Sequence, residues 1–137
     1  MTKNNKDILL DTNILLRFIL NDHPQLSLQA KHIIDQASEQ NHKLIINHAT
    51  LAETYFVLNK VYKLDNKKIS KVLTLLLKLP NIYIYKRPLI LATLDLLTRH
   101  NISFIDAYNL IHAKNYRLTL QTFDNHLKKL YRQYCNT

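Results

Sequence analysis

The chain has 137 residues, 47% of them hydrophobic and 21% charged, and it carries a net charge of +9 from 19 Lys and Arg against 10 Asp and Glu. This length and composition predict a single globular domain over residues 1–137, with no membrane association, because no segment approaches the roughly 20 consecutive apolar residues that a membrane-spanning helix needs. The positive charge favours a polyanionic partner, nucleic acid first of all, although a basic surface that only maintains solubility is the alternative.

Short apolar segments alternate along the chain with longer segments of helical periodicity. In chain order we expect a strand at Asp7–Leu10, a helix through Ile14–Ile19 that breaks at His23-Pro24, a helix capped by Ser27, a strand at Lys43–Asn47 and a helix at Ala49–Tyr62. A helix from the Asp65-Asn66 turn to Pro80, a strand at Ile82–Tyr85, helices at Pro88–His100 and Ser103–Asn115, a strand at Leu118–Thr122 and a helix at Asn125–Tyr134 follow. This order predicts a three-layer α/β/α sandwich around a short parallel sheet of four or five strands.

The chain contains no glycine, and this absence excludes several classes of enzyme. Walker-type phosphate loops, the dinucleotide-binding fingerprint and the nucleophile elbow of many hydrolases all need glycine for tight backbone geometry. A zinc site is disfavoured too, because the chain has a single cysteine and no two of its histidines lie four residues apart. That cysteine, Cys135, cannot form an internal disulfide, which fits a reducing cytoplasm.

Four carboxylates, Asp11, Glu53, Asp106 and Asp124, occupy positions typical of a metal site. Asp11 and Asp124 each directly follow a predicted strand, Glu53 lies within an apolar helix, and Asp106 is in the first turn of another helix. Acids at strand ends and on the adjoining helices predict a cluster that binds a hard divalent cation, and ligands that are all oxygen favour Mg²⁺ or Mn²⁺.

Each of these acids also has a structural interpretation. Asp11 and Asp124 are each placed to cap the helix that follows, and Asp106 completes a pattern with Ser103 that resembles a capping box. Capping and metal binding are compatible, because a carboxylate has several lone pairs.

Glu53 has apolar neighbours around most of its predicted helix, so we expect this glutamate to be partly buried. Burial of a carboxylate is costly without a cation or hydrogen-bond donors. A buried ion pair between Arg17 and Glu53 is the main structural alternative to a metal ligand.

Motifs spread over nearly the whole chain resemble one family. The apolar run before Asp11 leads into Asp11-Thr12-Asn13-Ile14-Leu15-Leu16-Arg17-Phe18, and Ala52-Glu53, Phe104-Ile105-Asp106-Ala107 and Thr122-Phe123-Asp124 follow in order. Each motif is weak alone, but the ordered set resembles the PIN-domain ribonucleases, and among these the VapC-type toxins of type II toxin–antitoxin systems. The resemblance implies an α/β/α fold with Asp11, Glu53, Asp106 and Asp124 as the catalytic and metal-binding acids, supported by Thr12, Asn13 and Thr122.

The resemblance also implies an activity and partners. We expect a metal-dependent endoribonuclease that hydrolyses RNA phosphodiester bonds with Mg²⁺ or Mn²⁺, with tRNA or rRNA as substrate, a cognate antitoxin and a homodimeric state. The chain departs from the family in one respect: where relatives often continue into a last short strand, it ends in the basic helical segment Lys128–Tyr134 and a few further residues.

Other functions remain open from the residues themselves. A non-catalytic basic module that binds nucleic acid would need the acids only as caps and ion pairs, and a PIN-like nuclease could act outside a toxin–antitoxin system or on DNA. A phosphatase of the haloacid-dehalogenase type is disfavoured because Asn13 stands where such an enzyme needs Asp, and the acidic pair of a receiver domain is missing.

Aromatic and histidine side chains add weaker signals. Tyr55, Tyr108 and Tyr116 are candidates for stacking on RNA bases, although core packing is the commoner role for such residues. His48 and His112 are candidates for positions near the acidic site, with packing as the alternative.

Overall fold

The computed structural model describes residues 6–135, which fall into two compact units, one up to Tyr85 and the other from Lys86 onward. The single domain predicted over residues 1–137 stays a prediction. Its two ends, residues 1–5 and 136–137, lie outside the described residues.

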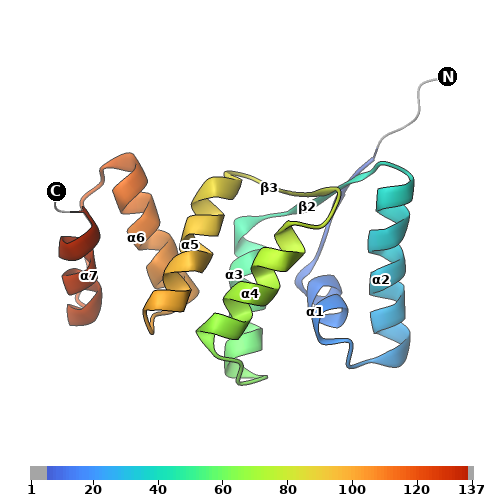
Figure 1. Ribbon diagram of the computed structural model, residues 1–137, viewed down its shortest axis with the longest axis horizontal. Helices are drawn as coiled ribbons and strands as arrows, with labels where there is room; N and C mark the ends of the chain where they lie inside the picture. The colour runs from blue at the N-terminus through green and yellow to red at the C-terminus, as the bar shows by residue number, and fades with distance from the viewer. Residues whose placement is uncertain (1–5, 136–137) are drawn as a thin grey trace. The chain divides into compact units, whose positions relative to one another are not determined.

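The first unit alternates strands with pairs of helices (Figure 1). Its elements are β1 (Asp7–Leu9), α1 (Thr12–Leu20), α2 (Pro24–Glu39), β2 (Lys43–Ile46), α3 (His48–Lys60), α4 (Asn66–Leu77) and β3 (Ile82–Ile84). The strands form a parallel sheet in the order β1-β2-β3, with Leu44 of β2 paired with Ile8 and with Ile82. The predicted α/β fold class with a parallel sheet is confirmed.

Side chains alternate between the two faces of this sheet, as a pleated strand requires. Leu44, Ile46, Ile82 and Ile84 are buried on one face. Lys43 belongs to the other face, where its ammonium nitrogen lies 5.1 Å from the centre of the Tyr83 ring. Helix α2 contacts β2, helix α4 contacts β3, and α1 packs against both α2 and α3. The core of the unit therefore lies between the helices and the apolar face of the sheet.

Helices α2, α3 and α4 of the first unit begin at polar residues whose side chains accept hydrogen bonds from free N–H groups of the first turn. Asn47 accepts from the Thr50 N–H at 2.7 Å, and Asp65 accepts from the Lys68 N–H at 2.9 Å. The prediction that Ser27 caps α2 is wrong. His23 is the N-cap, and Pro24 supplies a first position that needs no N–H donor.

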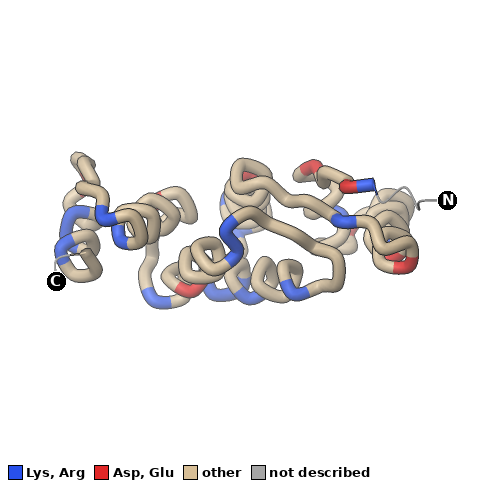
Figure 2. Tube along the Cα trace, turned by 90° about the horizontal axis from the view of Figure 1, so that it is seen from above, with Lys and Arg blue, Asp and Glu red and all other residues tan. Residues whose placement is uncertain are grey.

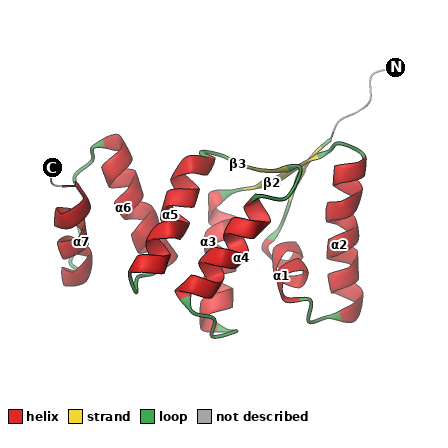
Figure 3. Ribbon diagram, in the orientation of Figure 1, coloured by secondary structure: helices red, strands yellow, loops and turns green. Residues whose placement is uncertain are grey.

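In its described residues, 86–135, the second unit contains three helices and no strand: α5 (Arg87–Arg99), α6 (Phe104–Tyr116) and α7 (Asn125–Cys135). Figure 3 accordingly draws no strand after β3. Helix α6 packs against α5 and α7, and Ile90, Leu94, Phe104 and Leu110 are fully buried.

The predicted strand at Leu118–Thr122 is not a strand, and the sheet has three strands in the described residues where four or five were expected. A strand exists only when its backbone groups pair with a neighbouring strand, and residues 86–135 contain no strand for this segment to pair with. The β-branched and apolar residues of this segment are therefore not sufficient to predict a strand. Instead, the Leu118 carbonyl accepts a hydrogen bond from the Tyr131 hydroxyl at 3.3 Å.

Turns in this glycine-free chain place larger residues in the left-handed backbone region. Among the described residues, six have φ between 49° and 66°: Asn21, Asn41, Lys63, Asn81, Lys86 and Arg117. Asparagine tolerates this conformation through local hydrogen bonds, whereas Lys and Arg carry the full steric cost of a Cβ atom, about 1–2 kcal/mol.

No helix within residues 6–135 is both long enough and apolar enough to cross a lipid bilayer.

Candidate functional site

Asp11 lies at the carboxyl edge of the parallel sheet, two residues after β1. The hydrogen bond from the Leu10 N–H to the Ile45 carbonyl, at 2.9 Å, carries the sheet pairing up to this point. Asp11 has the extended backbone of an N-cap, with φ −85° and ψ 159°, but its carboxylate accepts no capping hydrogen bond. The capping interpretation of Asp11 is therefore not borne out in its side chain, and the carboxylate is exposed and without a protein partner among the described residues. Of the two supporting residues that follow, Thr12 is buried and Asn13 is exposed.

Glu53 lies in the second turn of α3, and the expectation that it is partly buried is wrong: the residue is exposed. The buried side of α3 consists of Leu51, Thr54, Tyr55 and Leu58. Glu53 shares the opposite side with Phe56, which is itself 57% exposed. The apolar composition of this helix was thus a misleading signal, since one large apolar residue faces solvent beside the glutamate. Helices α1 and α3 pack against each other, so that Asp11 and Glu53 come from neighbouring helices.

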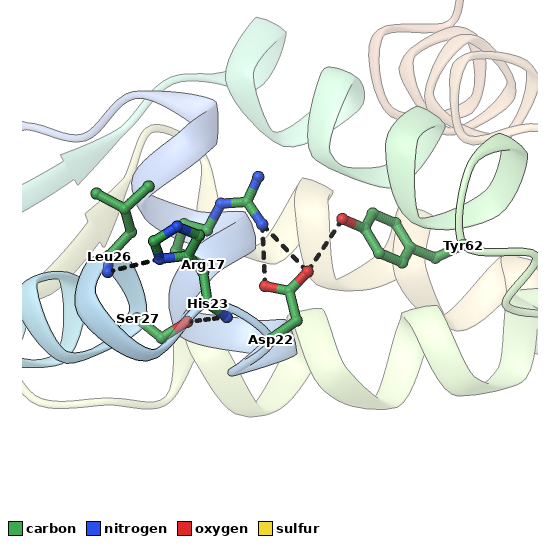
Figure 4. Close-up of polar contacts among 6 residues, drawn as sticks. All are labelled: Arg17, Asp22, His23, Leu26, Ser27 and Tyr62. Carbon is green, nitrogen blue, oxygen red and sulfur yellow. Dashed lines mark hydrogen bonds and ion pairs between the residues drawn. The ribbon is translucent and has the colours of Figure 1, made fainter.

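Arg17 pairs with Asp22 and not with Glu53 (Figure 4). Its Nη1 atom donates to both carboxylate oxygens of Asp22, at 2.9 and 3.1 Å, and the Tyr62 hydroxyl donates to Oδ2 at 3.2 Å. Desolvation raises the pKa of the Asp22 carboxyl, but the hydrogen bonds from Arg17 and Tyr62 and the positive charge of Arg17 outweigh it and lower that pKa. The proposed Arg17–Glu53 ion pair is absent from the described residues.

Next to this ion pair, His23 accepts one hydrogen bond and donates another at the start of α2 (Figure 4). The Leu26 N–H donates to His23 Nδ1 at 3.0 Å, and the His23 N–H donates to Ser27 Oγ at 3.2 Å. An imidazole nitrogen that accepts a hydrogen bond carries no proton, so this cap requires the neutral ring with its proton on Nε2. Ser27 was the predicted cap, and His23 was missed because histidine is not among the common N-cap residues.

Asp106 lies in the first turn of α6, where Ser103 is the N-cap. The Asp106 N–H donates to Ser103 Oγ at 3.1 Å, which confirms the capping half of the predicted pattern. The reciprocal bond from the carboxylate is not present in the described residues, so the half-buried Asp106 side chain has no hydrogen-bond partner there. Its negative charge is favourable at the positive end of a helix.

Asp124 caps α7, as its structural interpretation predicts. Its Oδ1 atom accepts from the Leu127 N–H at 2.8 Å. The Thr122 hydroxyl oxygen accepts from the Asp124 N–H at 3.1 Å, so this threonine supports the acid through its backbone. The second carboxylate oxygen of Asp124 remains available for another ligand.

Of the ten acids of the chain, five have a partner for their carboxylate in the described residues. Asp22, Asp35 and Asp95 pair with cations, and Asp65 and Asp124 cap helices. By contrast, five acids have carboxylates that form no ion pair or hydrogen bond within residues 6–135, despite the excess of Lys and Arg: Asp7, Asp11, Glu39, Glu53 and Asp106. No three His, Cys, Asp or Glu side chains are grouped to hold a metal ion in the part of the chain that the structure describes. The four-acid site therefore stays a prediction.

The aromatic and histidine candidates mostly have structural roles. Tyr55 is buried and donates to Asn66 Oδ1 at 2.6 Å, which supports core packing. On α6, Tyr108 lies between Phe104 and His112, with ring centres 5.9 and 4.1 Å apart, and burial raises the pKa of its hydroxyl. His48 bonds through Nε2 to the Tyr85 carbonyl, and His112 bonds through Nδ1 to the Tyr108 carbonyl.

Tyr116 differs from these tyrosines because it is exposed. The Lys86 ammonium nitrogen lies 5.1 Å from the centre of its ring, which is a cation–π geometry. Tyr116 is therefore the one predicted stacking residue whose ring is available at the surface. Lys and Arg positions, blue along the backbone tube of Figure 2, occur in both units.

The comparisons with known proteins place the chain in a family. No curated protein matches the chain. Residues 8–133 match the PIN domain family, a region that begins in β1 and ends in α7 and contains all four candidate acids. PIN domains are generally nucleases, enzymes that hydrolyse the phosphodiester bonds of nucleic acids. Because the match covers nearly the whole chain, the protein belongs to the PIN domain family.

Proposed function

We propose that the protein is a metal-dependent endoribonuclease and that Asp11, Glu53, Asp106 and Asp124 are its catalytic acids. The observation that carries this proposal is the set of carboxylates without protein partners, on the chain of a PIN-family member. In a chain with 19 Lys and Arg, five described carboxylates neither pair nor cap, and three of them, Asp11, Glu53 and Asp106, belong to the motifs that resemble PIN-domain ribonucleases. A bound cation would account for these three.

The donor set fits Mg²⁺ or Mn²⁺. All four candidate ligands are carboxylates, which hard divalent cations prefer, and three of the four are free of competing hydrogen bonds in the described residues. When bound, such an ion would activate a water molecule and stabilise charge on the phosphate. The acids would hold the ion, Thr122 would fix the backbone of Asp124, and Ser103 would fix the turn that carries Asp106.

RNA is the proposed substrate, with tRNA or rRNA as the first class to test. The net charge of +9 supports attraction of a polyanion, and exposed Lys and Arg side chains would contact the phosphate backbone. Tyr116, exposed and next to Lys86, is the tyrosine best placed to stack on an unpaired base.

A role as the toxin of a toxin–antitoxin pair is the finer proposal, and the VapC-type resemblance of the motifs supports it. Such a role entails a cognate antitoxin and a homodimer. Growth arrest on expression of the wild-type chain, relieved by co-expression of a small protein encoded just upstream, would support it. Growth arrest by an Asp11→Asn variant as well would contradict it, because the arrest would then not depend on catalysis.

The decisive experiment is a cleavage assay on purified protein with total tRNA and rRNA, in Mn²⁺ and in excess chelator. We expect cuts in Mn²⁺ that chelator abolishes, and no cuts by the Asp11→Asn or Asp106→Asn variants. Asp35→Asn is the matched control, since Asp35 is an exposed acid that only pairs with Lys31 at 3.6 Å. Full activity in either site variant would overturn the assignment of the acids, and preferential cutting of DNA of the same sequence would overturn the choice of substrate.

The main alternative is a non-catalytic module that binds nucleic acid, and the capping role of Asp124 is the observation that favours it. Calorimetry separates the two. Absence of Mn²⁺ uptake by the folded chain, together with RNA binding that chelator does not change, would establish the module.

A further inference from the structure

A cavity of about 610 Å³ lies wholly within the second unit, at the end of α6, the loop that follows it and the later part of α7. Side chains with distinct chemistry line it: Lys114, Arg117, Thr119, Tyr131, Tyr134 and Cys135. None of the four candidate catalytic acids is among the lining residues. The volume is within the range of about 300–1,000 Å³ typical of small-molecule sites.

The charge of this cavity is positive and uncompensated. Lys114 and Arg117 both line it, and neither forms an ion pair within residues 6–135. No acidic residue is part of the lining, so the cavity does not suit a cation. An ammonium and a guanidinium group in one cavity are the side chains that proteins use to bind phosphate.

Hydrogen bonds hold both tyrosines of the cavity in place, one to the lining residue Leu118 and the other to His100. The Tyr131 hydroxyl donates to the Leu118 carbonyl at 3.3 Å. The Tyr134 hydroxyl lies 2.6 Å from His100 Nε2, and the His100 ring meets the Tyr134 ring edge to face with centres 5.5 Å apart. Rings fixed in this way lose little conformational entropy when a flat ligand stacks on them.

The positive charge of the cavity and its fixed tyrosine rings together match the chemistry of a nucleotide. A nucleotide combines a phosphate group, which the two cations can bind, with a flat base, which an aromatic ring can stack. On α7, Lys128, Lys129 and Arg132 are exposed and do not line the cavity, so positive charge continues beyond it along the same helix. This continuation favours a strand over a free mononucleotide.

We propose that this cavity binds one nucleotide of an RNA strand, with the base on the tyrosines and the phosphate on Lys114 and Arg117. The identity of the strand rests on the proposed nuclease function, whereas binding of the nucleotide unit does not. The cavity is thus a substrate subsite that uses none of the catalytic acids.

Cys135 gives a direct measure of occupancy, because it lines the cavity and is the single cysteine of the chain. Burial raises the pKa of its thiol, so that labelling with a disulfide reagent such as Ellman's reagent is best done at alkaline pH. The experiment uses the full chain with Asp11→Asn, in chelator, so that RNA is bound but not cut. The labelling rate is measured with four ribonucleoside 5′-monophosphates, with short single-stranded oligoribonucleotides, with the matching nucleosides, and with inorganic phosphate.

We expect nucleotides and oligonucleotides to slow the labelling of Cys135 in a saturable manner, with the oligonucleotides acting at lower concentration. The double variant Lys114→Gln/Arg117→Gln should weaken protection by mononucleotides about tenfold or more, since hydrogen bonds between charged partners are the strong ones. The charge-matched control Lys128→Gln/Lys129→Gln should leave mononucleotide protection unchanged and weaken only the oligonucleotides.

Several results would overturn the proposal. These are no protection by any nucleotide or oligonucleotide, equal protection in the Lys114/Arg117 variant, and protection by inorganic phosphate as strong as by nucleotides, which would indicate a simple anion site. Protection by free mononucleotides with no gain for the oligonucleotides would overturn the RNA strand as the source. A failure of the proposed nuclease function is distinguishable from a failure of this cavity proposal, because nuclease activity is measured separately, as RNA cleavage in Mn²⁺ by the chain with wild-type Asp11.

Discussion

Tyr62, just beyond the end of α3, donates its hydroxyl hydrogen to Asp22, which lies forty residues earlier in the loop between α1 and α2. The same carboxylate is held by Arg17 of α1. One aspartate therefore connects the end of one helix with the loop between two others. This contact fixes the far ends of α1 and α3, the two helices that carry Asp11 and Glu53 near their starts.

Asp22→Asn should destabilise the protein in a manner that depends on pH. The folded pKa of Asp22 lies below its ordinary value of 3.8, so the folded state favours the charged carboxylate more than the unfolded chain does. The resulting stabilisation is fully present above the ordinary pKa and is lost as the pH falls through the lowered one. We expect the difference between wild type and variant to be constant near neutral pH and to shrink as the pH falls below the ordinary pKa of 3.8.

Urea unfolding at a series of pH values measures this difference. Asp35→Asn serves as the control, because its partner Lys31 is an exposed neighbour at i,i−4. A gap between wild type and Asp22→Asn that stays the same across the acidic range would show that the carboxylate charge does not contribute.

His23→Ala should cost about 1 kcal/mol of unfolding free energy, the typical effect of losing an N-cap. The variant leaves the Leu26 N–H without its acceptor, whereas His23→Asn supplies a side-chain oxygen in the same place. Thermal unfolding of both variants at neutral pH tests this role. Equal losses in the alanine and asparagine variants would mean that the imidazole stabilises by contacts other than the cap.

At Asp124 two substitutions separate the cap from the proposed catalytic role. Asp124→Asn keeps a good N-cap residue and should leave stability nearly unchanged, whereas Asp124→Ala should lose about 1 kcal/mol. Under the proposed function both abolish Mn²⁺-dependent RNA cleavage, because both remove the negative charge. Stability is measured by urea unfolding, and cleavage on tRNA and rRNA. An asparagine variant that cleaves normally would reduce Asp124 to a cap.

Mn²⁺ should raise the melting temperature of the wild-type protein, since a ligand that binds only the folded state stabilises it. The gain is about 2.7 kcal/mol at a metal concentration one hundred times the dissociation constant. Asp11→Asn should lose most of this gain while its stability without metal changes by less than about 0.5 kcal/mol, because the carboxylate makes no capping bond.

Differential scanning calorimetry in Mn²⁺ and in chelator measures both quantities. Asp35→Asn, which should keep the full response to metal, is again the control. A Mn²⁺-induced shift of equal size in wild type and Asp11→Asn would remove Asp11 from the metal site.

Local patterns in the sequence were sufficient to predict most of the helices and strands. Ser103, Asp65 and Asp124 are common N-cap residues, and the helices that follow them begin at the next residue. The three strands of the first unit follow from short β-branched runs bounded by polar residues. Capping depends on neighbouring residues alone, whereas these three runs form strands because they also pair with one another.

The errors concern features that depend on distant residues. Whether Leu118–Thr122 forms a strand depends on a partner strand, and whether Glu53 is buried depends on which side of α3 packs against other helices. The hydrophobic pattern of α3 did not show which side of the helix is buried, because Phe56 is apolar and yet exposed. The cavity beside Cys135 was missed as well, since its lining comes from two helices and a loop.

Three of the six residues in the left-handed backbone region are positively charged: Lys63, Lys86 and Arg117. Glycine at these positions would relieve the steric strain of the backbone. Replacing any of them with glycine would relax the turn and, by the same change, delete one positive charge. At these turns, higher folding stability and attraction for polyanions therefore require different residues. A glycine variant would be more stable and would bind nucleic acid less well.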